Sequence, residues 1–129
     1  MVGIPFYRAG TLMTQYESLD VALTRLEAAM RAGDLWKSQT QPEPSAFDSE
    51  QPFNADTMSM GQWLRYVLIP RLRSLMDGRH PLPDNANIAP AAEVYLQENR
   101  SSVRLPILEA LRDVDNVLVK GKLRPQESE

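Results

Sequence analysis

The chain has 129 residues and a formal net charge of −3, and 43% of its residues are hydrophobic. This composition is typical of one soluble domain with a single core. The chain has no cysteine, which excludes disulfides, thiolate metal sites and cysteine nucleophiles. No apolar run approaches the roughly 18 residues of a membrane span, and residues 1–12 lack the pattern of a secretory signal. We therefore expect a cytoplasmic protein without membrane contact.

Charge is distributed unevenly along the chain. Acidic residues exceed basic ones over residues 14–60 and 81–119, whereas residues 61–80 contain four arginines against Asp77 alone. Such a basic segment can bind phosphate or pair with acidic neighbours. The chain has no overall basic surplus of the kind expected for a nucleic-acid binder, and this favours pairing within the protein.

The first predicted helix spans about residues 14–32. Apolar side chains recur there at offsets of 0, 3, 7, 10 and 14 from Tyr16. Gly33 and Asp34 end it. Residues 1–12 are expected to be a disordered extension before a single domain at 13–120.

Residues 38–54 are predicted to be irregular because Gln, Ser, Glu and Pro dominate them. Irregular links of this length are uncommon in compact domains and are either functional or laid tightly over the surface. Two aromatic side chains, Phe47 and Phe53, are expected to anchor the link to the body of the protein.

The second predicted helix spans about residues 59–77 and ends at Gly78. Leucines mark one of its sides, and Trp63, Tyr66 and Pro70 mark a second apolar side. A helix that is apolar most of the way round is normally buried, so the pattern predicts the central helix of the fold. Alternatively, these three residues line a surface groove for a partner. Pro70 should also kink the helix and free a carbonyl near Tyr66 for a new donor, such as Arg65, Arg71 or water.

Two further helices are predicted after a Pro81-Leu82-Pro83 spacer. The third spans about residues 88–98, and the fourth begins after a cap at Ser101 or Ser102 and runs to about residue 120. Residues 121–129 form a polar tail. Strand signals are absent, so we predict an all-α, compact bundle of four helices with a long irregular connection between helices 1 and 2.

The order of short motifs resembles the YqcC-like family of short bacterial proteins, whose biochemical role is unassigned. The motifs are QPF at 51–53, DTM at 56–58, WL at 63–64, IPR at 69–71, PLP at 81–83 and AP at 89–90. The resemblance covers about residues 14–119. Gly61 and the pair Ala91-Ala92 depart from it, because larger side chains are usual there. Members are often encoded beside a tRNA pseudouridine synthase, so the resemblance implies an accessory role in tRNA modification.

Several polar residues are candidates with simple structural alternatives. His80 stands alone in a turn and cannot form a histidine-cluster metal site. Asp56 and Thr57 precede the second helix and could form an anion-binding or catalytic pair, but a helix cap accounts for them more simply. Glu93 and Tyr95 could face Arg71 and form a buried ion pair. Carboxylates of the last helix are interpreted as its solvated face; they are Glu109, Asp113 and Asp115.

Two classes of function remain open. The first is a non-catalytic helical adaptor whose implied partner is a tRNA pseudouridine synthase, with tRNA contact through Arg71 or Arg79, and a homo-oligomer is compatible with it. The second is a small-ligand binder or enzyme with a polar pocket around Asp56, Arg65, Arg71 and Glu93. No phosphate loop, GxSxG or HExxH motif is present, so we expect no catalytic residue, metal or cofactor. The candidate binding residues are Phe53, Asp56, Trp63, Tyr66, Arg71, Arg79, His80, Glu93 and Tyr95.

Overall fold

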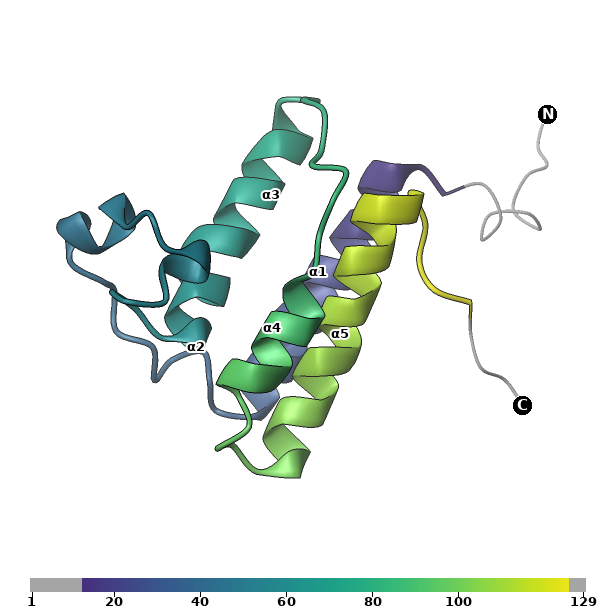
Figure 1. Cartoon of the computed structure of the whole chain (residues 1–129). Helices are drawn as coiled ribbons and strands as arrows, with labels where there is room; N and C mark the ends of the chain where they lie inside the picture. The colour runs from purple at the N-terminus through teal and green to yellow at the C-terminus, as the bar shows by residue number, and fades with distance from the viewer. Residues whose placement is uncertain (1–12, 126–129) are drawn as a thin grey trace, which may run out of the picture.

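A computed structural model describes residues 13–125, and within this range the chain is helical without strands (Figure 1). The extension expected at residues 1–12 lies outside the described residues, as do residues 126–129 of the tail. The helices are α1 (Gln15–Ala32), α2 (Met60–Trp63), the π-helical segment η4 (Leu64–Leu68), α3 (Ile69–Asp77), α4 (Ile88–Tyr95) and α5 (Ser101–Lys120). Because α2, η4 and α3 follow one another without a break, they form one helical run. The predicted bundle of four helices is confirmed.

The two ends of α1 follow from its sequence. The Thr14 hydroxyl accepts a hydrogen bond from the Glu17 N–H, and the Glu17 carboxylate accepts one from the Thr14 N–H, which completes a capping box. At the other end, Gly33 is the last half-helical residue and Asp34 takes the left-handed conformation, with φ of 62°. A Cβ on Gly33 would lie 3.0 Å from a Val103 methyl, so a larger residue there would have to shift this side chain of α5 slightly.

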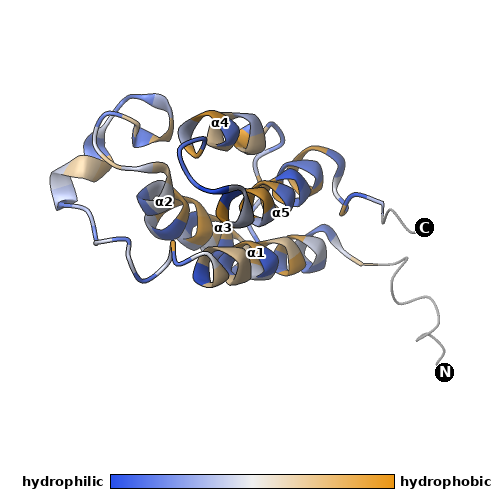
Figure 2. Cartoon of the chain, turned by 90° about the horizontal axis from the view of Figure 1, so that it is seen from below, coloured by the Kyte–Doolittle hydropathy of each residue, from blue (hydrophilic) through white to orange (hydrophobic). Residues whose placement is uncertain are grey.

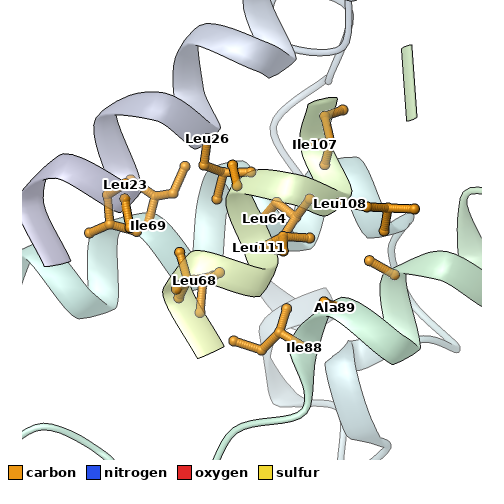
Figure 3. Packing of buried hydrophobic residues seen from close by; sticks show 14 of the residues in the cluster. Leu23, Leu26, Leu64, Leu68, Ile69, Ile88, Ala89, Ile107, Leu108 and Leu111 are labelled. Atoms are coloured by element: carbon orange, nitrogen blue, oxygen red, sulfur yellow. The ribbon is translucent and has the colours of Figure 1, made fainter. Parts of the chain in front are cut away.

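The centre of the bundle is α5. It packs lengthwise against α1 and also against α4, as Figures 1 and 2 show. Figure 3 shows Ile107, Leu108 and Leu111 of α5 meeting side chains from the other helices in one core. The prediction that the second helix is central is therefore wrong. Its leucine side is buried, but Trp63 and Tyr66 are only half-buried and Pro70 is exposed.

Pro70 coincides with a local change of helix type. In η4 the Ile69 N–H donates to the Leu64 carbonyl five residues back, which widens the helix by one residue. Proline has no N–H and its ring crowds the carbonyl of the preceding turn, and a wider turn just before Pro70 accommodates both effects. The expected distortion is thus present as a π-turn. Arg65, one of the donors expected to repair the helix, instead donates to the carbonyl of Trp36.

Two predicted helix caps are wrong. The cap of α2 is Ser59, whose hydroxyl accepts from the Gln62 N–H at 3.0 Å, whereas the Asp56 carboxylate accepts a hydrogen bond from the Ser49 hydroxyl. At the start of α5 the capping residue is Arg100, and no side chain caps that end. Neither Ser101 nor Ser102 therefore has the predicted role.

The long connection between α1 and α2 lies over the surface with two short 3-10 turns, η2 (Pro44–Asp48) and η3 (Pro52–Asn54). Of its two expected anchors, Phe53 packs against the core, but Phe47 is 40% exposed. Ala46 is the buried residue of η2 instead. The Ala46 side chain, rather than the ring of Phe47, therefore faces the body of the protein.

Candidate functional site

Three of the predicted site residues come together from separate parts of the chain. The rings of Phe53 and Trp63 lie 4.9 Å apart in an edge-to-face arrangement, and those of Phe53 and Tyr95 lie 6.5 Å apart. Such geometry is favourable for aromatic pairs. We call Phe53, Trp63 and Tyr95 the aromatic surface, because Tyr95 remains 50% exposed. It joins the irregular connection, α2 and the end of α4.

Phe53 is held in an unusual backbone conformation. Its φ of 59° lies in the left-handed region, which is rare for a bulky residue, and Asn54 follows with φ of 49°. Two side chains fix this turn through the Ala46 carbonyl: the Asn54 amide donates to it at 3.0 Å and the Thr57 hydroxyl at 2.7 Å. The segment therefore holds the Phe53 ring in place at a conformational cost.

A hollow of about 200 Å³ lies beside the aromatic surface. Phe53 and Tyr95 line it together with Ala55, Met58, Ser59 and Met60. The two methionines are nearly fully buried, at 7% and 6% exposure, so the hollow has an apolar floor. Methionine side chains adapt readily to different shapes, which suits a surface that receives another side chain.

Arg65 and Tyr66 do not line a groove but hold the connection onto the second helix. The Tyr66 hydroxyl donates to the Gln39 carbonyl at 2.9 Å, and the Arg65 guanidinium lies 4.7 Å from the centre of the Trp36 ring, over its face. Gly61 belongs to the same contact, because a Cβ there would come within 2.7 Å of the Gln39 side-chain oxygen. Glycine at this position thus lets Gln39 cross the helix closely.

Arg71 is exposed and is not part of a buried pair. Ion pairs within residues 13–125 do not include it, and Glu93, its expected partner, is exposed as well. The pairing predicted for Arg71 with Glu93 is therefore wrong. Another residue of the basic segment, Arg73, does pair within the protein and reaches Asp20 of α1 at 2.8 Å.

Arg79 and His80 lie in the turn after α3. The His80 N–H donates to the Leu75 carbonyl at 2.9 Å and the Arg79 N–H to the Met76 carbonyl at 3.1 Å, which is a Schellman motif. Arg79, rather than Gly78, takes the left-handed conformation, with φ of 57°. Gly78 instead makes room for the His80 ring, whose nearest carbon would lie 2.5 Å from a Cβ. The exposed Arg79 side chain passes over Tyr16 at 5.9 Å from the ring centre.

The four residues of the alternative polar pocket do not form one cluster of contacts. The Asp56 carboxylate accepts a hydrogen bond from the Ser49 hydroxyl, and the Arg65 guanidinium donates one to the Trp36 carbonyl. Glu93 lines a hollow of about 380 Å³ between α4 and α5. That hollow is lined by Arg112 and Lys120 rather than by Arg71.

The carboxylates of α5 are more than a solvated face. Asp113 is only 9% exposed and accepts from Arg124 at 2.7 Å, and Arg25 of α1 lies 3.7 Å away. Arg124 also reaches Glu109 at 2.7 Å, so residues after α5 fold back onto it. Sequence reasoning missed this cluster. Asp113 falls one residue before Val114 of the predicted apolar stripe, which was the available signal.

Asp115 caps the neighbouring helix. Its two oxygens accept from the N–H groups of Ile88 and Ala89 at 3.0 and 2.9 Å, at the N-terminus of α4. Burial raises the pKa of the Asp115 carboxyl, and these two hydrogen bonds oppose the shift. At Glu109 the hydrogen bond from Arg124 is the main cause of a lowered pKa. Asp115 therefore joins α5 to α4, and Glu109 holds the segment after α5 against that helix.

Residues 13–125 contain neither a metal-ligand cluster nor a helix suited to span a membrane. No group of three or more His, Asp or Glu side chains is arranged to hold a metal ion there. No helix in the same range combines the length and apolarity of a membrane span.

Comparisons with known proteins place the chain in a family. The family model DUF446, described as "tRNA pseudouridine synthase C", matches residues 18–117. The uncharacterized protein YqcC of Escherichia coli (strain K12) is 38% identical over 103 residues, covering 80% of this chain and 93% of that protein. The solution NMR structure of E. coli YqcC matches with a TM-score of 0.72 and 33% identity, covering 91% of this chain and 98% of that one.

A third similarity has a different form. A protein of Pectobacterium carotovorum subsp. carotovorum named tRNA pseudouridine synthase C is 35% identical over 71 residues, which are 55% of this chain but only 19% of that protein. The segment similar to this chain is thus a small part of a longer polypeptide. From the family model, YqcC and its structure together, the chain belongs to the YqcC-like family, as the motifs from QPF to AP predicted.

Proposed function

We propose that this chain is a non-catalytic helical accessory protein that binds a tRNA pseudouridine synthase. The observation that carries the proposal is the segment similar to this chain within the Pectobacterium protein named tRNA pseudouridine synthase C. Covalent linkage keeps two parts at a high effective concentration. A separate chain needs a binding surface to reach the same arrangement, and the aromatic surface is the best candidate for it.

The placement of the polar residues supports a binding role over a catalytic one. Arg65 and Tyr66 hold the connection, and Asp56 is bonded to Ser49. The alternative polar pocket around Asp56, Arg65, Arg71 and Glu93 loses support because Asp56 and Arg65 bond to other groups and Arg71 does not pair with Glu93. Catalysis normally needs a nucleophile or base within hydrogen-bond reach of a partner group.

Capture from the native bacterium tests the proposal. A tagged copy of the chain, expressed at its natural level, should enrich a tRNA pseudouridine synthase over an untagged strain when the eluate is quantified by mass spectrometry. An unrelated tagged helical protein of similar charge is the control for non-specific capture. Equal amounts of the synthase in all three eluates would contradict the proposal.

Direct tRNA contact is a separate part of the proposal and would use the exposed residues Arg71 and Arg79. Affinity for bulk tRNA should then fall with salt, and replacing either arginine with glutamine should reduce the slope of log affinity against log salt by about 0.9 per lost duplex contact. Arg100→Gln is the matched control, because Arg100 is also exposed. Slopes unchanged in both variants would exclude RNA contact through these arginines.

A further inference from the structure

We infer that the aromatic surface and its adjacent hollow receive an apolar side chain flanked by Lys or Arg on a partner protein. This inference rests on the proposed function, because it identifies the face that would meet the synthase. Three features of the described residues carry it: an open apolar hollow, a costly backbone conformation that shapes it, and a surrounding chain segment of one charge.

The hollow has the character of a receiving site. Its volume of about 200 Å³ suits one large apolar side chain, and Met58 and Met60 form an adaptable floor. Tyr95 at its edge is 50% exposed, and Val94 beside it in the chain is 60% exposed. Aromatic side chains around a small pocket are typical of the energetic centre of an interface.

The conformation of Phe53 is a second feature. A left-handed backbone at a phenylalanine is unfavourable, and the surrounding structure has to enforce it. Here Asn54 and Thr57 enforce it through the Ala46 carbonyl. The ring is thereby directed onto Trp63 at 4.9 Å and forms one wall of the hollow. An unstrained backbone conformation at Phe53 would not place its ring along the hollow.

The negative charge of the chain segment around the hollow favours a basic partner. Residues 38–64 contain no Lys or Arg, and their charged residues are all acidic: Glu43, Asp48, Glu50 and Asp56. The hydrogen bond from Ser49 to Asp56 brings Asp48 and Glu50, the chain neighbours of Ser49, near Asp56, which follows Phe53 by three residues. An acidic chain segment beside the hollow attracts a basic protein segment and repels phosphate. RNA-binding enzymes have basic surfaces, so a synthase fits this requirement and RNA does not.

Two peptides and an RNA test the inference without the synthase. The probes are a short peptide with a central leucine flanked by lysines, its counterpart flanked by glutamates, and a single-stranded RNA oligonucleotide. In amide and indole NMR spectra of the labelled chain, the lysine peptide should shift the signals of Phe53, Trp63 and Tyr95, and the other two should not. Equal shifts with both peptides, shifts with RNA alone, or no shift with any probe would overturn the inference.

Variants test the same surface with the purified synthase in calorimetry. Tyr95→Ala should weaken binding about tenfold or more, whereas Val119→Ala, at a residue 53% exposed on α5, should have no effect. The double change Asp48→Lys with Glu50→Lys should weaken binding and make the affinity less dependent on salt concentration. Asp77→Lys with Asp84→Lys is the matched control, because these acidic residues are also exposed.

The outcomes separate this inference from the proposed function. If the synthase binds but neither Tyr95→Ala nor the double lysine change weakens it, the inference is wrong and the proposed function stands. If the synthase does not bind but the lysine peptide shifts the aromatic surface, the proposed function fails and the inference stands. Self-association that Tyr95→Ala abolishes, or competition by a peptide of residues 1–12, would assign the hollow to this chain itself and overturn the inference.

Discussion

Phe53 combines an unfavourable backbone with favourable ring contacts, and single substitutions can separate the two. Phe53→Ala should lower the free energy of unfolding by about 2 kcal/mol, because the ring packs against Trp63 and Tyr95. Phe47→Ala should change it by less than about 0.5 kcal/mol, since Phe47 is largely exposed. Urea unfolding of both variants measures the difference.

Glycine at position 53 isolates the backbone contribution. Phe53→Gly loses the same ring as Phe53→Ala but accepts the left-handed φ without a Cβ clash. It should therefore be about 1 kcal/mol more stable than Phe53→Ala. An alanine variant as stable as the glycine variant would show that the strain at Phe53 is not present in solution.

The ion pairs of Arg124 lead to a pH-dependent prediction. The hydrogen bond from Arg124 lowers the pKa of Glu109 in the folded protein. The ionised Glu109 carboxylate therefore stabilises the fold above its unfolded-state pKa. This stabilisation is lost as the pH falls through its folded-state pKa. Arg124→Gln should lower the melting temperature at pH 7, because Asp113 is buried and loses its nearest partner. The difference between the two proteins should shrink below about pH 4.

Comparing the two proteins at each pH removes the contribution of other groups. The raised pKa of Asp115 acts with the opposite sign, since its protonation favours the folded state, but it is common to both proteins. A difference in melting temperature that stayed constant from pH 7 to pH 3 would mean that Arg124 does not pair with these carboxylates in solution.

Among the elements, the second helical run and the connection before it behave as one unit. Tyr66, Arg65 and Gln62 each donate a side-chain hydrogen bond to a carbonyl of that connection. Tyr66→Phe removes one of these bonds and should cost about 1 kcal/mol. Amide exchange around Gln39 should become faster, while exchange in α5 should change only with global stability. Tyr95→Phe is the control, and equal effects of the two changes would contradict the role given to Tyr66.

Within the same connection, residues 40–45 should exchange faster than α1. Thr40, Gln41 and Glu43 are exposed and precede the short 3-10 turn η2, and Pro42 and Pro44 have no N–H to donate to regular structure. Hydrogen-exchange mass spectrometry resolves this segment from its neighbours. Protection comparable to that of α1 would show additional order in the connection.

The sequence predicted the helices where local signals agreed, but it did not predict which helix lies at the centre of the bundle. The apolar spacing from Tyr16 and the glycines at 33 and 78 gave the extent of α1 and the end of α3, because capping and periodicity are local properties. The central position of α5 depends on long-range contacts with α1 and α4. The broad apolar surface of the second helix indicated burial, but part of it covers only the irregular connection.

The candidate site was predicted in part for a similar reason. Three aromatic residues named as candidates from the sequence, Phe53, Trp63 and Tyr95, lie together in the structure. Charged residues were less predictable, because the partner of a side chain depends on the tertiary fold. Thus Arg71 is unpaired among the described residues, whereas Asp115, which looked solvated, caps α4 from a different helix.

At the scale of the whole molecule, the structural carboxylates and most of the candidate binding residues lie in different regions. The α1, α4 and α5 helices form the tightly packed side of the bundle (Figure 1), where the structural carboxylates lie. The second helical run and its connection carry most of the predicted site residues. This division suits an accessory protein, since the binding face can vary while the packed helices maintain the fold.

Calorimetry of the purified chain with a purified tRNA pseudouridine synthase C from the same bacterium tests the central claim most directly. We expect saturable binding in the micromolar range or tighter, with tighter binding at low salt because the chain is acidic and the enzyme binds RNA. No heat of binding at several temperatures, together with separate elution of the two proteins in gel filtration, would contradict the account.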